Sequence, residues 1–327
     1  MATGLAPNLT QVYMQYVNLF PLIYDYTELK PPRAHLFTKP PAYPSRLRSL
    51  TLHGPTPEST ETWNEYTHFY NLTTFQLHGV YKYDLLSKLS TFPTKLPPLE
   101  SLLTTAPWAE NPLSIPFKHH GTKLRKLGLL LSLPPRRPGR KPHIALNQIN
   151  QIKAHCHYLR HLIIRIPRAQ GDAHEVEIYR TLDIASLSSL SIELDCTAFN
   201  DDIKPTLVNL AIDEKRVRSI FSTITNSSSP SSLLQTLRVE VFMNAPYGKL
   251  EIFHALMSET IWEAFRAPDG IFMHESLRDK RDTWRKTVAV TDDWIGDVPA
   301  EKEFRELWPS KGGHWMQDWH SFPLQLT

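Results

Sequence analysis

The sequence predicts an α/β fold, an irregular leucine-rich repeat solenoid of horseshoe shape that ends in a C-terminal helical cap. Three observations support this prediction. A short leucine frame recurs along the chain, its copies follow one another at a nearly regular interval, and stretches with helical spacing lie between the copies. A repeat of one strand and one helix buries its apolar face only against its neighbours, so we expect the copies to stack side by side.

The recurring frame is L-x-x-L-x-L, and its first copy is LRSLTL, which begins at Leu47. Alternate residues of a strand point to opposite faces of a sheet. We therefore expect Leu50 and Leu52 to point into the core, with Thr51 and His53 facing outward. Further copies are LTTFQL at Leu72, LRKLGL at Leu124, LRHLII at Leu159, LSSLSI at Leu187 and LQTLRV at Leu234, with weaker ones in LPPLESLL at Leu99 and LVNLAI at Leu207.

The spacing of the copies agrees with a repeat architecture. From Leu47 to Leu234, leaving out the weak copy at Leu207, the steps are 25, 27, 25, 35, 28 and 47 residues. Leucine-rich repeats have a period of about 20 to 29 residues, so four of the six steps fit and the other two require insertions. Between copies, PESTETWNEYTHFY and DEKRVRSIFSTIT place apolar residues at helical spacing, the second behind an expected N-cap at Asp213.

These patterns divide the chain into three expected parts. Residues 1–45 form an N-terminal cap segment, residues 46–250 the repeat array, and residues 251–327 a Trp-rich C-terminal cap. The last part contains six of the eight tryptophans, and we interpret EIFHALMSETIWEAFR and EKEFRELW within it as helices. An aromatic unit of this kind would cover the apolar end of the last repeat. An aromatic binding surface is the alternative interpretation.

The charge distribution predicts an acidic partner. No Asp or Glu occurs between Glu110 and Asp172, whereas the same span contains twelve Lys and Arg residues. We call the part of this span from Lys118 to Arg168 the basic belt, residues 118–168. Because repeats stack, cations that are distant in sequence, such as Lys126 and Arg165, are expected to align into one positive surface.

A proline-rich interruption, LPPRRPGRKPHI, lies within the basic belt and predicts an exposed loop, because proline cannot complete a helix or a strand ladder. Flexible basic segments of this kind act as nuclear localisation patches or enter nucleic-acid grooves. A solvated insertion without a binding role is the alternative. The cations of this basic loop are Arg136, Arg137, Arg140 and Lys141.

Several kinds of chemistry lose their sequence support. The chain contains no G-x-x-x-x-G-K-[ST], G-x-G-x-x-G, G-x-S-x-G or H-E-x-x-H motif. His155, Cys156, His157 and His161 include residue types that bind metals. The repeat frame, however, places Cys156 at a turn and His161 on a strand, which favours a packed thiol. We therefore predict a protein that is not an enzyme, with no catalytic residues, no metal and no cofactor.

The sequence also predicts a location inside the cell. The N-terminus lacks the pattern of a secretory signal, and the longest apolar run, residues 127–133, is far shorter than the roughly 20 residues that cross a bilayer. The two cysteines, Cys156 and Cys196, fit a reducing compartment. We expect a cytoplasmic or nuclear protein without a membrane partner.

Two stretches resemble a known family. HCHYLRHLIIRIP, residues 155–167, and VNLAIDEKRVRSIFSTI, residues 208–224, resemble the irregular leucine-rich repeat regions of fungal F-box proteins, and the resemblance covers roughly residues 45–290. It implies a repeat array that recognises substrates for a ubiquitin ligase, reached through an F-box that docks on a Skp-type adaptor. Residues 1–45 show no F-box pattern, so this docking is expected only if an F-box is supplied elsewhere.

Taken together, the patterns predict a non-enzymatic protein–protein interaction scaffold whose repeat surface recognises an acidic protein. The alternative is a nucleic-acid-associated protein that uses the basic belt. Outward strand residues on the concave face are the expected contacts of the partner, because binding residues are displayed on a rigid scaffold. These residues are Thr51, His53, Gln76, His78, Lys126, Arg165, Glu193, Arg238 and Glu240.

Overall fold

In a computed structural model, the described part of the chain forms an α/β fold with a ten-stranded open mixed sheet and six helices. This confirms the predicted α/β class. The described residues are 10–15, 46–53, 69–78, 96–105, 114–130, 144–196, 203–226, 233–242, 260–277, 298–309 and 318–325.

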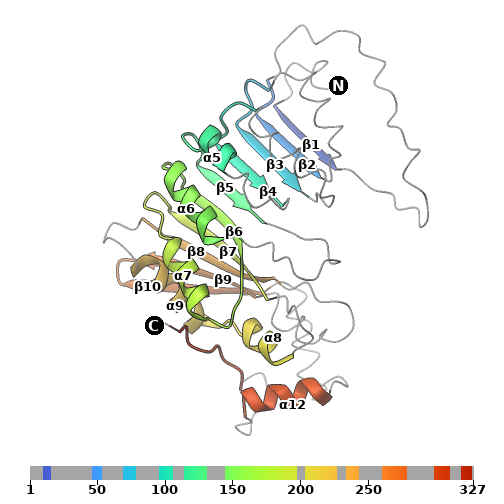
Figure 1. The fold of residues 1–327 in the computed structure, drawn as a ribbon, viewed down its shortest axis with the longest axis vertical. Helices are drawn as coiled ribbons and strands as arrows, with labels where there is room; N and C mark the ends of the chain where they lie inside the picture. Colours follow the sequence, from blue (N-terminus) through green and yellow to red (C-terminus); the bar gives the residue numbers. More distant parts are fainter. Residues whose placement is uncertain are drawn as a thin grey trace, which may run out of the picture.

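The ten strands lie in the sheet in the order in which they occur in the chain (Figure 1). The first eight pair in parallel, and the last two are added as antiparallel neighbours. The strands are β1 Gln11–Gln15, β2 Ser49–His53, β3 Thr74–His78, β4 Ser101–Thr104, β5 Lys126–Leu129, β6 His161–Pro167, β7 Ser189–Asp195, β8 Thr236–Phe242, β9 Thr260–Ala267 and β10 Gly270–Leu277.

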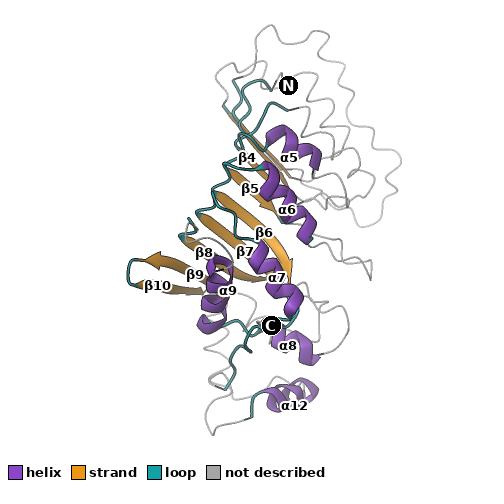
Figure 2. Cartoon of the chain, turned by 60° about the vertical axis from the view of Figure 1, so that its left-hand side comes forward, coloured by secondary structure: helices purple, strands orange, loops and turns teal. Residues whose placement is uncertain are grey.

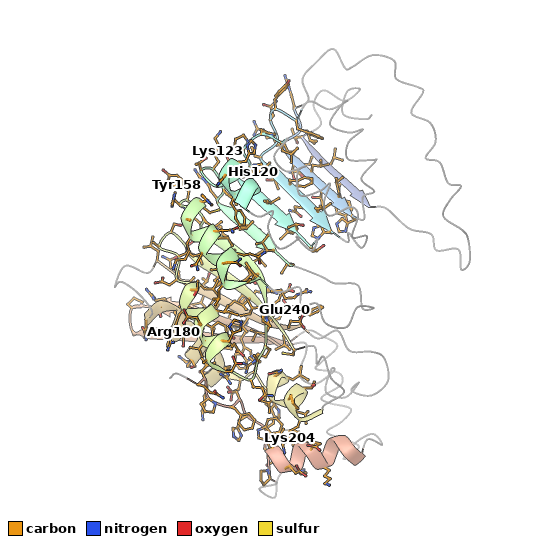
Figure 3. All side chains as sticks on the ribbon, viewed as in Figure 1. His120, Lys123, Tyr158, Arg180, Lys204 and Glu240 are labelled. Atoms are coloured by element: carbon orange, nitrogen blue, oxygen red, sulfur yellow. The ribbon has the colours of Figure 1, made fainter. Side chains whose placement is uncertain are left out.

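The described helices are α5 Ser114–His120, α6 Leu146–His155, α7 Ala173–Thr181, α8 Ile203–Leu210, α9 Glu214–Asn226 and α12 Val298–Leu307. Figure 2 shows α5, α6 and α7 following one another along one side of the sheet. The helix α9 packs beside α7 and against β9. The helices α8 and α12 lie near each other, where Lys204 forms an ion pair of 3.0 Å with Glu306 (Figure 3).

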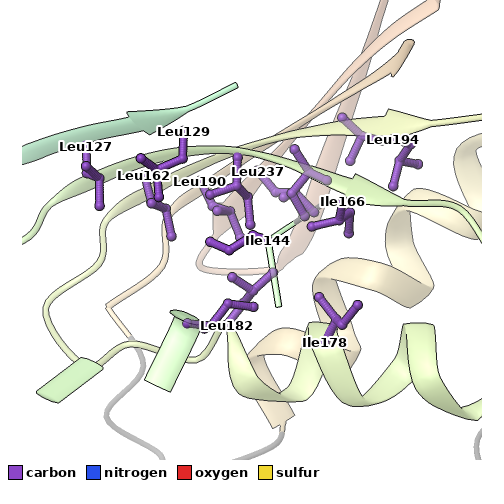
Figure 4. Close-up of a cluster of buried hydrophobic side chains, with 14 of the residues drawn as sticks. Leu127, Leu129, Ile144, Leu162, Ile166, Ile178, Leu182, Leu190, Leu194 and Leu237 are labelled. Atoms are coloured by element: carbon purple, nitrogen blue, oxygen red, sulfur yellow. The ribbon is translucent and has the colours of Figure 1, made fainter. Parts of the chain in front are cut away.

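The leucine frames form the core of the sheet. The second position of each frame is paired across seven consecutive parallel strands, from Leu50 on β2 to Leu237 on β8, and the third position is paired from Leu52 to Val239. No residue at the three frame positions of these seven strands is more than 7% exposed. Figure 4 shows part of the resulting row, in which Leu127, Leu162 and Leu190 lie beneath adjacent strands. The strands predicted from the frames at Leu47, Leu72, Leu99, Leu124, Leu159, Leu187 and Leu234 are confirmed.

A row of backbone hydrogen bonds fixes where each parallel strand begins. The carbonyl oxygen of Arg48 accepts hydrogen bonds of 2.9 Å from the N–H groups of Thr73 and Thr74 on the next turn. The same pattern, in which one carbonyl accepts two hydrogen bonds, recurs at every turn. It satisfies backbone groups at the strand starts that would otherwise have no partner. The accepting carbonyls belong to Thr10, Arg48, Thr73, Glu100, Arg125, Arg160 and Ser188.

This row aligns the residues that flank the first leucine of each frame. Lys123 and Arg125, for example, flank Leu124, and Tyr158 and Arg160 flank Leu159 on the next turn. We call the row of flanking residues the strand-entry edge. Because the hydrogen bonds set the register, a side chain on this edge stands beside its equivalent on the neighbouring turn.

A buried polar cluster joins the end of β6 to α7. Glu175 accepts a hydrogen bond of 2.7 Å from the hydroxyl of Tyr179 and forms an ion pair with Arg168, and neither partner of that pair is exposed. Burial alone would raise the pKa of Glu175, but the charge of Arg168 and the hydrogen bonds outweigh it, so the pKa lies below its ordinary value. Gly171, at φ +79°, lies against the guanidinium of Arg216 on α9, where a side chain would collide.

The strand expected from one weak copy of the frame is wrong. LVNLAI at Leu207 is not a strand, because residues 203–210 form α8. The L-x-x-L spacing also fits a helix, in which residues three apart lie on one face. Pro205 lies in the first turn of this helix, a position that proline tolerates. The insertion that lengthens the step from Leu187 to Leu234 to 47 residues thus includes α8 and α9.

The expected helix over residues 251–266 is also wrong for the part that the structure describes. Thr260–Ala267 is the strand β9, and it forms a two-stranded hairpin with β10 around Pro268-Asp269. Proline and aspartate favour tight turns, and the Ile, Trp and Phe residues of β9 favour strands. The sheet therefore continues beyond residue 250, whereas α12 confirms the helix expected in EKEFRELW.

The described C-terminal tryptophans pack against the core. Trp308 is 1% exposed, and Trp262 and Trp319 are partly buried against the same core. The indole N–H of Trp262 donates to the carbonyl of Ile212 at 3.2 Å, and that of Trp308 donates to the carbonyl of His320 at 3.0 Å. These three tryptophans are therefore held by contacts within the fold.

Two other expectations concern residues 54–68 and 131–143, which lie outside the described residues. The first range holds most of the helical pattern PESTETWNEYTHFY. The last residue of that pattern, Tyr70, is described: it lies in a turn and is 73% exposed. The second range holds the basic loop with Arg136, Arg137, Arg140 and Lys141.

The leucine row predicts a large difference between neighbouring residues of one strand. Leu190→Ala removes a fully buried side chain and should lower the free energy of unfolding by about 2–5 kcal/mol. Ser191→Ala on the opposite face should change it by no more than about 0.5 kcal/mol. Chemical denaturation followed by circular dichroism measures both, and equal losses would contradict the assigned faces.

Candidate interaction surface

The sheet face opposite the leucine row, which we call the open face, carries all nine residues predicted to contact a partner. Strand alternation and register place them there in three columns that run across the strands. Lys126 belongs to the column of first strand residues, which also contains His161. The second column contains Thr51, Gln76 and Arg238, and the third contains His53, His78, Arg165, Glu193 and Glu240.

The part of the open face on β1 to β3 carries a stack of aromatic rings. The rings of His53 and His78 lie 4.5 Å apart between centroids and are nearly parallel, with an interplanar angle of 16°. Tyr13 lies against His53 at 4.9 Å. Burial, followed by the neighbouring His53, lowers the pKa of His78 below its ordinary value. The uncharged form of the His78 ring is therefore favoured within the stack.

The part of the open face on β6 to β9 carries charges that are paired with one another. Arg165 forms an ion pair of 2.6 Å with Glu193 and stacks on the ring of Phe242 at 3.6 Å from its centroid. Arg238 lies 3.3 Å from Glu240 and 3.6 Å from Glu263. The two guanidinium groups in this part thus form ion pairs with three carboxylates.

The expected alignment of Lys126 with Arg165 is not found. Lys126 is exposed at the start of β5, whereas Arg165 is 8% exposed, lies in another column and is paired with Glu193. Arg168 is also removed from the surface by its ion pair with Glu175. The described cations of the basic belt therefore do not form one continuous positive surface on the open face.

Apart from Lys126, the exposed cations of the basic belt that the structure describes lie at the strand-entry edge and at the ends of α5 and α6. Figure 3 shows Lys123 and Tyr158 at the same edge of the molecule. Tyr158 is 64% exposed and was not among the predicted contact residues. Its position before the first leucine of LRHLII is the sequence signal that identifies it. The exposed cations of this region are Lys118, Lys123, Arg125, Lys126, Lys153 and Arg160.

The possible metal ligands around Cys156 are separated by the structure. Cys156 is the C-cap residue of α6 and is buried, and burial raises the pKa of its thiol to about 12. His161 is an exposed first residue of β6, as the frame predicted. Within the described ranges, no group of three or more His, Cys, Asp or Glu residues is arranged to hold a metal ion.

The comparisons with known proteins supply no family. The sequence matches no protein-family model, and no curated protein sequence is similar to it. Among the described helices, none combines the length and the apolar character that crossing a bilayer requires. The open face and the strand-entry edge are therefore the candidate functional surfaces of this chain.

The histidine stack predicts a pH-dependent stability. Because the pKa of His78 is lower in the folded protein than its ordinary value of 6.5, the unfolded state binds more protons as the pH falls through that value. The free energy of unfolding should therefore fall between about pH 7.5 and about pH 5.5, the range in which histidine titrates.

His78→Gln should reduce this fall, measured by urea unfolding across the same pH range. His161→Gln, at an exposed position, is the matched control and should leave it in place. An unchanged pH dependence in His78→Gln would show that His78 does not cause the fall.

Proposed function

We propose that this protein is a non-enzymatic interaction scaffold, built as an irregular leucine-rich repeat solenoid, that binds a protein partner. One observation carries the proposal: buried and outward residues alternate in a single register over seven parallel strands. Such a wall holds outward side chains in fixed columns, which is how repeat proteins build extended binding surfaces.

The order of elements supports the solenoid within this proposal. The strands follow the chain from β1 to β8 without exchange, and described helices lie between β4 and β8 at each turn. Sequential stacking of this kind is typical of repeat architectures, in which each turn contacts only its neighbours. The antiparallel β9 and β10 then cover the last parallel strand, a position that a terminal cap occupies.

An acidic partner is supported by the first half of the open face. The described strand residues of β1 to β5 include no Asp or Glu, and Lys126 is their exposed cation. His53 and His78 lie in the same half and add no negative charge to it. A carboxylate-rich surface would therefore meet no repulsion there, whereas the paired charges of β6 to β9 offer polar contacts of both signs.

A narrower form of the proposal follows from the resemblance to fungal F-box proteins. The partner would then be a substrate presented for ubiquitination in the cytoplasm or nucleus, and a Skp-type adaptor would join through an F-box supplied elsewhere. Co-purification of such an adaptor tests this form. The alternative function is nucleic-acid association through the basic belt, which predicts an affinity that falls steeply with salt.

The proposal predicts capture of a protein that depends on the open face. Thr51→Glu with Gln76→Glu places two charges in the central column and should reduce recovery of the partner by roughly tenfold, because like charges meet an acidic surface. Lys215→Gln with Lys302→Gln changes the net charge equally at exposed positions on α9 and α12 and should leave recovery unchanged.

The measurement is affinity purification from native lysate followed by quantitative mass spectrometry, with and without nuclease. A protein recovered with the original chain and the control variant, but not with the open-face variant, supports the scaffold. Recovery that is equal with all three chains contradicts it, and recovery lost on nuclease treatment favours nucleic acid.

A further inference from the structure

Several cations of the described chain form ion pairs, but the exposed cations of the basic belt at β5, at the strand-entry edge and at the helix ends do not. Elsewhere, some cations on the helices and on β8 form ion pairs with described carboxylates, whereas the exposed Lys215 and Lys302 do not. The pairs are Arg180 with Glu177, Lys204 with Glu306, Arg218 with Glu214, Arg238 with Glu240 and Glu263, and Arg305 with Asp318. None of the six exposed cations at the edge and the helix ends forms an ion pair with a described carboxylate.

Four of these cations need an explanation other than helix capping. Lys118 and Lys153 lie in the last turns of α5 and α6, where a positive charge favours the helix dipole. The other four, Lys123, Arg125, Lys126 and Arg160, lie outside any helix, so this effect does not account for them.

The backbone hydrogen bonds hold these four cations in a compact group. The N–H of Arg160 donates to the carbonyl of Arg125 at 2.9 Å, and Lys126 is the register partner of His161. Neighbouring strands lie about 4.8 Å apart, and residues along a strand are separated by about 3.3 Å. The side chains of Lys123, Arg125 and Arg160 therefore stand close enough to act on one ligand.

The group ends abruptly on both sides along the edge. On the preceding turn, the equivalent of Arg125 is the exposed carboxylate Glu100, which repels a long anion that extends in that direction. On the following turn, the equivalents are Ser186 and Ser188, whose hydroxyls donate to the carbonyls of Leu159 and Arg160. The positive patch is therefore about two turns wide, on the order of 10 Å.

Tyr158 adds an aromatic surface to this patch. It precedes Leu159 on the edge, in the place that Lys123 occupies on the preceding turn, and it is 64% exposed. Exposed tyrosine flanked by arginine is typical of binding surfaces, because the ring offers apolar area and the hydroxyl offers a hydrogen bond. A partner that covers the ring would thus combine carboxylates with an apolar side chain.

The small size of the patch distinguishes between the two kinds of polyanion. Duplex nucleic acid binds through many phosphate contacts spread over a long surface, commonly about 6 to 10. A patch two turns wide, limited by Glu100, offers too few cations for that number of phosphate contacts. A short acidic peptide segment needs only a few carboxylates beside an apolar residue, and it fits these dimensions.

We infer that the strand-entry edge at β5 and β6 docks a short acidic segment of the partner protein, with Lys123, Arg125 and Arg160 pairing with carboxylates and Tyr158 covering an apolar side chain. This inference rests on the proposed function, because it assigns one part of the scaffold to one part of the partner. Lys126 and His161 directly follow Arg125 and Arg160 and belong to the first column of the open face, so the docking site is continuous with that face.

The test uses a fluorescent peptide of Asp-Glu-Leu repeats, with a peptide of Asn-Gln-Leu repeats and a single-stranded RNA as comparison probes. Fluorescence anisotropy with the full chain should show the acidic peptide binding more tightly than either comparison probe. Arg125→Gln with Arg160→Gln should lower the affinity for the acidic peptide by roughly tenfold at low salt. Tyr158→Ala should lower the same affinity severalfold, although it leaves the net charge unchanged.

Lys215→Gln with Lys302→Gln lowers the net charge by the same amount and should preserve binding within about twofold, since exposed charges far from a ligand act weakly. Equal losses in the two double variants would overturn the inference, because net charge alone would explain them. Tighter binding of the RNA would overturn it in favour of nucleic acid. Circular dichroism and thermal unfolding confirm that the variants fold.

The outcome separates this inference from the proposed function. If a captured partner depends on the open-face variant Thr51→Glu with Gln76→Glu but not on Arg125→Gln with Arg160→Gln, the scaffold stands and the docking edge is wrong. If capture depends on neither, the scaffold itself fails.

Discussion

The structure depends on one constraint, which is that the apolar residues of each turn are buried only when the next turn is in register with it. A shift of one residue would turn Leu50 and Leu52 to the outside and Thr51 to the core. The row of carbonyls from Thr10 to Ser188 adds a backbone condition, because each must face two N–H groups of the next turn. Burial and hydrogen bonding thus fix the same register, and the outward columns follow from it.

The outward columns divide the surface into parts with different chemistry. On the open face, the first strands carry uncharged side chains and the histidine stack, and the later strands carry charges that pair with each other, such as Arg165 with Glu193. At the strand-entry edge, Lys123, Arg125 and Arg160 have no such pairing with described carboxylates. The proposed binding role arises from this contrast, because groups that neutralise each other hold the sheet together, whereas Arg125 and Arg160 remain available for another molecule.

The sequence predicts the strands well because its frame contains both the alternation of a strand and the repetition of a stack. It fails where a pattern has two physical solutions: the spacing around Leu207 also fits a helix, and residues 260–266 satisfy a helical spacing but turn back at Pro268-Asp269 as a hairpin. It places the nine outward residues on one face. The sequence does not predict the ion pair of Arg165 with Glu193, because 28 residues separate them and only the strand register brings them together.

The most direct measurement of the central claim is disulfide formation between neighbouring turns. Thr51 and Gln76 are register partners on the open face, so Thr51→Cys with Gln76→Cys should form a disulfide on mild oxidation, since adjacent strands bring Cα atoms within bridging range. Thr51→Cys with Leu77→Cys places the thiols on opposite faces and should remain reduced. Bridging of the second pair as readily as the first would contradict the register on which the surface and its proposed partner depend.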